Sequence, residues 1–105
     1  MTAIELTKEA ERDLIDIFLF GIEHFGVAEA DRYSAALMEK IESAAANPSF
    51  GADYDFVRSG LRRYETTSHA IYYTRTKDGI LVLRILHGRM DPGHHLVRSL
   101  QIPEK

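Results

Sequence analysis

The sequence predicts an α+β fold in which a helical hairpin packs on a small antiparallel sheet, with the element order β-α-α-β-β-β. Two patterns predict this fold. Apolar residues recur at three- and four-residue spacing in the first half of the chain, whereas β-branched and aromatic runs separated by turn residues fill the second half. The length of 105 residues fits one domain spanning 1–105.

Two helices are expected after a short alternating strand at residues 3–6. Thr7 can cap the first helix with its side-chain oxygen, and Gly26 can end it. Its predicted apolar face consists of Ala10, Leu14, Ile17, Phe18, Gly21 and Phe25. The second helix presents Ala30, Tyr33, Leu37, Ile41 and Ala44, and ends before Pro48. Because the link between them is short, the two helices should form an antiparallel hairpin.

Three strands are predicted at 61–66, 70–74 and 80–86, with a tight turn at 77–79. The last strand is apolar on both faces apart from Arg84, which predicts a central position in the sheet. The helical hairpin can cover only one face, so the C-terminal residues or another chain should cover the second. A short helix is expected to start after Asp91 and to continue through Leu96.

Charge is divided unevenly along the chain, although the net charge is only −3. Residues 1–57 carry four basic and twelve acidic side chains, and residues 58–105 carry nine basic and four acidic ones. This asymmetry favours a basic surface that meets an acidic partner or nucleic acid, and ion pairing between the two halves is the alternative.

Several function classes lack support in the sequence. The absence of cysteine excludes disulfides and thiolate chemistry, and no nucleotide-binding glycine motif or elbow serine occurs, so no cofactor is expected. The chain has no signal-peptide pattern and no apolar run long enough to cross a membrane, which favours a cytoplasmic location.

Basic side chains gather on the predicted strands and their ends, namely Arg62, Arg63, Arg84, His87 and Arg89. Guanidinium groups pair with phosphate oxygens, and imidazole transfers protons near neutral pH, so the group is a candidate for phosphate contact. Strand alternation sends Arg62 and Arg63 to opposite faces. For His87, a packed or capped histidine without catalytic function is the favoured interpretation.

Two further groups are weaker candidates. Asp91, His94 and His95 have a spacing that metal ligands can have, but they fall short of the four ligands of a structural site, and helix capping accounts for Asp91. No metal is therefore expected. Tyr64, Tyr72 and Tyr73 could stack on RNA bases, although aromatic residues on strands more often pack in a core.

Five blocks, in order, resemble the ParE toxins of the RelE/ParE superfamily. They are LTKEAERDLIDIFLF, FGVAEADRYSAAL, NPSFG, GLRRYETTSHAIYY and VLRILHGRMDP, and the resemblance extends from about residue 4 to residue 96. It implies a type II toxin of the kind linked to plasmid stabilisation. Such a toxin inhibits DNA gyrase without being an enzyme and is held inactive by a ParD-like antitoxin in a hetero-oligomer. No cofactor, membrane contact or sequence-specific DNA binding by the toxin alone is implied.

The resemblance also suggests site residues. Target contact is expected of Arg62, Arg63, Tyr64, Arg84, His87, Arg89 and Met90. Antitoxin contact is expected of Phe18, Ile22, Tyr33 and Leu37, although Phe18 and Leu37 also fit the core. The alternative is a RelE-type ribonuclease that cuts messenger RNA at the ribosome, with Arg62, Arg84, His87 and Arg89 as catalytic residues near Glu65. A binding module without toxic activity would have the same sequence features.

Overall fold

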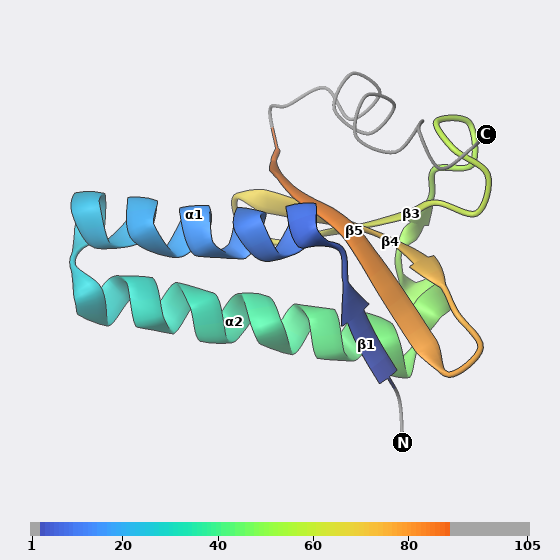
Figure 1. Cartoon of the computed structure of the whole chain (residues 1–105), viewed down its shortest axis with the longest axis horizontal. Coiled ribbons are helices and arrows are strands. Elements are labelled where there is room, and N and C mark those ends of the chain that lie inside the picture. Colours follow the sequence, from blue (N-terminus) through green and yellow to red (C-terminus); the bar gives the residue numbers. More distant parts are fainter. Residues whose placement is uncertain (1–2, 89–105) are drawn as a thin grey trace.

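A computed structural model describes residues 3–88 of the chain. Figure 1 shows two long antiparallel helices lying beside a sheet. The elements in order are β1 (Ala3–Leu6), α1 (Lys8–Phe25), α2 (Val27–Ala46), the 3₁₀ turn η1 (Pro48–Phe50), β2 (Ala52–Asp53), β3 (Arg62–Glu65), β4 (His69–Arg75) and β5 (Gly79–His87). Within the described part of the chain, no helix is long and apolar enough to cross a membrane. The helix predicted after Asp91 lies outside the described residues.

The predicted ends of α1 are confirmed. Thr7 precedes the helix, and its Oγ1 accepts a hydrogen bond from the backbone N–H of Ala10 at 3.0 Å. The same hydroxyl donates to the carbonyl oxygen of Leu83 on β5 at 2.7 Å, which joins the start of the helix to the sheet. Gly26 ends α1 with φ at +92°, a backbone conformation that costs glycine little.

The predicted helical hairpin is also confirmed, and α2 supplies most of its buried residues. Leu37 and Ile41 are buried, and Tyr33 is half-buried. Close packing of the two helices depends on Gly21, where a Cβ atom would lie 3.2 Å from that of Ala30. Phe25 was expected on the buried face but is 69% exposed, because the turn of the hairpin projects beyond the sheet (Figure 1).

The α+β fold class is confirmed, and the sheet contains five strands in the order β1-β5-β4-β3-β2. Strands β5, β4 and β3 are antiparallel, as predicted. The short β2, which was not predicted, adds antiparallel to β3, whereas β1 pairs parallel with β5 and makes the sheet mixed. β1 can approach β5 because Gly79 has no side chain next to the backbone of Ala3. β5 is thus an interior strand, and β4 occupies the middle position.

Both faces of the sheet are covered within the described residues. Ile80, Val82 and Ile85 belong to the core under the helices. Leu83 and Leu86 pack on the second face with Leu61, and the loop between β2 and β3 adds Tyr54 and Val57 there. The sequence suggested the C-terminal residues or another chain as the cover of this face, whereas the structure shows the loop between β2 and β3 folded onto it.

Candidate interaction site

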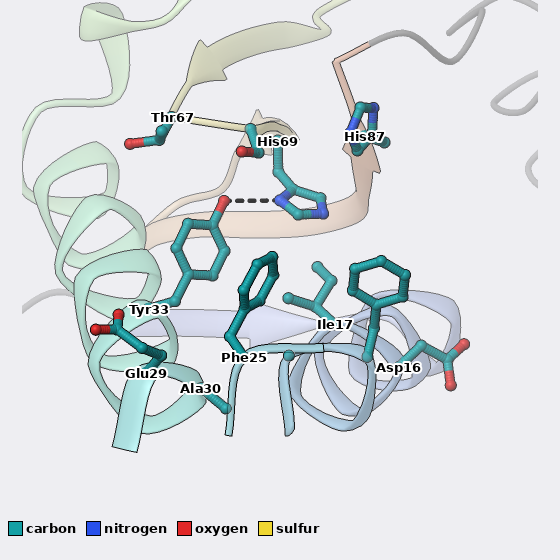
Figure 2. A pocket seen from close by; sticks show the side chains of 12 residues that line it. Asp16, Ile17, Phe25, Glu29, Ala30, Tyr33, Thr67, His69 and His87 are labelled. Carbon is teal, nitrogen blue, oxygen red and sulfur yellow. Dashed lines mark hydrogen bonds between the residues drawn. The ribbon is translucent and has the colours of Figure 1, made fainter. Parts of the chain in front are cut away.

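A cleft opens between the turn end of the helical hairpin and the neighbouring ends of β4 and β5. Its volume is about 590 Å³, and Figure 2 shows apolar side chains from the helices facing two histidines from the strands. The residues that line it are Asp16, Ile17, Phe20, Gly21, Phe25, Glu29, Ala30, Tyr33, Thr67, Ser68, His69 and His87. Phe20 and Phe25 are 56% and 69% exposed, so the cleft presents apolar surface to solvent.

A polar cluster lies where the hairpin meets the strands. The Oη of Tyr33 is hydrogen-bonded to Nδ1 of His69 at 2.7 Å (Figure 2) and approaches Oγ1 of Thr66 at 3.3 Å. The rings of His69 and His87 meet edge to face with their centroids 5.5 Å apart. His69 is half-buried and His87 is exposed, so the inner ring is held while the outer ring lies at the surface.

The environment of His69 disfavours its protonated form. Burial lowers the pKa of the imidazole, and the nearby His87 lowers it further, while Asp13 acts in the opposite direction. His69 is therefore held neutral over more of the range near neutral pH than a solvated histidine.

A β-bulge in β5 places the side chain of His87 on the side of the sheet that faces this cleft. Between β4 and β5 the register changes, so that Tyr73 lies opposite Val82 while Tyr72 lies opposite Arg84. Leu83 is the extra residue, and every residue after it changes face relative to a regular strand. His87 consequently lies opposite His69 on the helix side of the sheet.

The residues expected to contact the target are distributed over both faces of β3. Arg62 lies opposite Tyr73, and its Nη1 donates to the carbonyl oxygen of Gly51 at 2.5 Å. Tyr64 lies on the same face, where the Nζ of Lys40 is 5.5 Å from its ring centroid. The predicted alternation is confirmed, because Arg63 points to the other face.

Arg63 is held by aromatic and acidic partners on that second face. Its Nε donates to the Oη of Tyr72 at 2.9 Å, and its Nη1 pairs with Glu65. The guanidinium carbon lies 5.6 Å from the ring centroid of Tyr54 and 5.8 Å from that of Tyr72. This half-buried cation is positioned by cation–π contacts as well as by its ion pair.

The residues proposed for ribonuclease chemistry do not form one cluster among the described residues. Arg62 pairs with Tyr73 and His87 with His69, so the two are four positions apart along β4, about 13 Å. Arg62 lies on β3 and His87 lies on β5, the two strands that flank β4. Arg84 is engaged with Asp13 at the edge of β5.

Several expected site residues lie outside residues 3–88. Arg89 and Met90 belong to this group, as do the weak metal candidates Asp91, His94 and His95. Within the described range, no group of three or more histidine, aspartate and glutamate side chains could hold a metal ion.

The residues expected to contact an antitoxin occupy three environments. Leu37 is 2% exposed and belongs to the core, the alternative already considered for it. Phe18 and Ile22 are half-buried on α1. Tyr33 lines the cleft and is its link to His69.

Sequence reasoning missed most of the cleft. His69 and Phe20 were not singled out, and Phe25 was assigned to the core. One signal was available, because pairing of the two strands around the turn at 77–79 brings His69 close to the end of β5. Counting residues from that turn places His69 opposite Leu86, and the bulge is what moves it opposite His87.

With this geometry in place, comparison with known proteins is decisive. Residues 4–92 match the model of a family described as the ParE toxin of the type II toxin–antitoxin system parDE. The chain belongs to the ParE toxin family. The resemblance indicated by its five sequence blocks is thus confirmed, and the chain is a ParE-type toxin of a toxin–antitoxin system.

Relatives of this ParE family member span nearly its whole length. Toxin ParE1 of Mycobacterium tuberculosis is 36% identical over 92 residues, which cover 87% of this chain and 94% of the relative. Toxin ParE1 of Caulobacter vibrioides is 32% identical over 91% of this chain and 99% of its own length. Toxin ParE of Escherichia coli is 36% identical over 87% of this chain and 89% of its own length.

A solved structure shares the fold. The chromosomal ParDE toxin–antitoxin system of P. aeruginosa contains a chain that superposes with a TM-score of 0.70 at 20% identity. The superposition covers 83% of this chain and 96% of that one. The hairpin-on-sheet architecture of this ParE family member is therefore also found in a solved ParDE system.

Proposed function

We propose that this chain inhibits DNA gyrase by binding it, without catalysing a reaction, and that a ParD-like antitoxin neutralises it. The observation that carries the proposal is the match of residues 4–92 to the ParE family, together with the fold in common with a ParDE system. A gyrase target would place the toxin in the cytoplasm, and a toxin paired with an antitoxin can stabilise the plasmid that encodes both.

The arrangement of the basic residues supports a binding function over RNA cleavage. General acid–base catalysis needs groups within hydrogen-bond reach of the same substrate atoms. Arg62 and His87 are about 13 Å apart along the strand direction alone, and Arg84 is occupied by Asp13. His87 remains as an exposed side chain at the mouth of the cleft, suited to contact a target.

The cleft supports a role in antitoxin binding. Its walls expose Phe20 and Phe25, and burying such aromatic surface is a strong contribution to association. Tyr33 adds a hydroxyl that already has partners within the fold. An apolar segment of a ParD-like antitoxin would fit this combination.

The target is tested with purified gyrase and the refolded chain in supercoiling and DNA-cleavage assays, run in parallel with an in-vitro translation reaction. We expect loss of supercoiling or accumulated gyrase-linked breaks, with intact messenger RNA. Cut messenger RNA with unaffected gyrase would instead assign the chain to the ribonucleases. Antitoxin binding with no effect in either assay would identify a module without toxic activity.

His87→Ala separates binding from catalysis. Loss of a binding contact at the surface should weaken gyrase inhibition about tenfold or less. Loss of a general acid or base, in contrast, lowers a reaction rate on the order of 10²–10⁴-fold. Lys77→Ala, in the exposed turn between β4 and β5 at the opposite end of β5, is the control and should leave the activity unchanged. Both variants need an unfolding curve, because a strand-end substitution can lower stability.

The antitoxin contact is tested with a purified ParD-like antitoxin that neutralises the chain. Phe25→Ser should weaken its binding at least tenfold, because the ring contributes exposed apolar surface at the cleft. Phe56→Ser is the control, since Phe56 is 80% exposed and does not line this cleft. Equal affinity of the two variants for the antitoxin would remove the cleft from its binding surface.

A further inference from the structure

Helix α1 carries a second apolar stripe on its solvent side. Ile15 is 58% exposed and Leu19 is 54% exposed, and the four-residue spacing places them on one face. Leu19 follows the fully buried Ala10 by nine residues, or two and a half helical turns, so the two lie on opposite sides of the helix. The stripe therefore points away from the core and is not explained by the packing of the chain.

Opposite charges border this stripe at its two ends. Arg12 lies seven residues before Leu19, and Glu23 lies four residues after it, so all three share the exposed face. The described structure gives neither charge an ion-pair partner. Eleven residues of helix separate them by about 16 Å, which is too far for them to pair with each other.

We propose that this face of α1 joins two copies of the chain in a symmetric dimer with the two helices antiparallel. In that arrangement Arg12 of each copy faces Glu23 of the other, and Ile15 of each copy packs near Leu19 of the other. A two-fold axis makes both contacts occur twice. The result is an apolar centre between two identical ion pairs, in keeping with the apolar core and polar rim typical of protein interfaces.

The charge pattern favours a second copy over an unrelated partner. The stripe is complementary to itself when reversed, because its positive and negative ends lie at similar distances from the apolar centre. The two Arg12 and the two Glu23 side chains are all paired in the dimer. The inference is independent of the proposed gyrase target, since it concerns the free chain, and the stripe is separate from the residues that line the cleft.

The dimer should be weak. One pair of short helices buries less than the roughly 1,600 Å² of a standard interface, so we expect a dissociation constant in the micromolar range. Sedimentation equilibrium of the refolded chain from about 1 to 300 µM brackets such an affinity. The apparent mass should rise from that of a monomer toward that of a dimer over this range.

Charge reversal supplies the test of the geometry. Arg12→Glu and Glu23→Arg should each weaken self-association at least tenfold, because each places like charges opposite each other twice. The double variant R12E/E23R should restore the dimer. An equimolar mixture of the two single variants should also associate, since each position 12 then faces an opposite charge at position 23 in the other copy.

Arg75→Glu is the control, because it makes the same charge change on an exposed position of β4. It should leave association unchanged. Circular dichroism establishes that each variant is folded. A chain that stays monomeric up to 300 µM would overturn the proposal, as would a dimer insensitive to both single reversals or a double variant that fails to recover.

Discussion

The carboxylate of Asp13 on α1 accepts hydrogen bonds from both Nε and Nη2 of Arg84 on β5, at 2.8 and 3.0 Å. Its Oδ2 also accepts the backbone N–H of Ile85 at 2.9 Å. β1 pairs with β5 only as far as Val82, so the carboxylate takes the place of a neighbouring strand beyond that point. Arg84, expected at the target surface, is thereby engaged in holding the helix to the sheet edge.

Asp13→Asn should lower the free energy of unfolding by about 3 kcal/mol, because it leaves a largely buried guanidinium without its carboxylate. The hydrogen bond to Asp13 is also the main cause that raises the pKa of Arg84. Urea unfolding at neutral pH measures the loss. Glu42→Gln on the exposed side of α2 is the control and should change stability by less than about 0.5 kcal/mol. A loss as small as that of the control would contradict a structural role for the pair.

His69 should make stability fall in mild acid. Its pKa in the folded chain lies below the ordinary 6.5, so in acid the unfolded chain takes up a proton that the folded chain resists. Its contribution to stability is complete above about pH 6.5 and is lost as the pH falls below that value. His69→Gln should therefore flatten the decline measured by urea unfolding between about pH 7.5 and 5. An NMR titration that places the His69 pKa at or above 6.5 would refute this prediction.

Thr7→Ala should destabilise the fold by about 1–2 kcal/mol, because one hydroxyl both caps α1 and donates to the carbonyl oxygen of Leu83. Thr7→Ser keeps the hydroxyl and is the control. Thermal and urea unfolding of the two variants should separate them clearly. Equal losses in both would point to the methyl group of Thr7 instead of its hydrogen bonds.

Gly79→Ala should weaken the attachment of β1. A Cβ atom at this position would lie 1.9 Å from the carbonyl oxygen of Ala3, so the backbone must move, at a cost of about 1–3 kcal/mol. Hydrogen exchange at residues 3–6 should rise more than exchange in β4. Gly88→Ala is the control, because its Cβ would be 3.6 Å from the carbonyl oxygen of Ser68, an ordinary contact. Unchanged exchange in β1 would show that the strand tolerates the shift.

Local signals explain why much of the fold could be predicted. Thr7 and Gly26 mark the ends of α1, and the spacing of Leu37 and Ile41 indicates the buried side of α2. Each of these signals acts over a few residues through backbone capping or helical periodicity. Phe25 was the exception, because a helix pattern does not indicate where the sheet beneath it ends.

The candidate site was predictable only in part. Tyr33 and His87 were singled out, but for different surfaces, and their common neighbour His69 was not. Arg62 and Arg63 were correctly assigned to opposite faces by strand alternation. Their partners, the carbonyl of Gly51 and the ring of Tyr72, depend on how β3 packs against the rest of the chain.

The order of the main helices and strands, the capped hairpin and the membership in the ParE family follow from the amino-acid sequence alone, because local spacing and matched motifs encode them. The parallel docking of β1, the bulge at Leu83 that turns His87 toward His69, and the Asp13–Arg84 pair are visible only in the folded chain. Each of these three features depends on contacts between residues that are distant in the chain. Such contacts form only when the packing of helices on the sheet fixes which backbone edges and side chains meet.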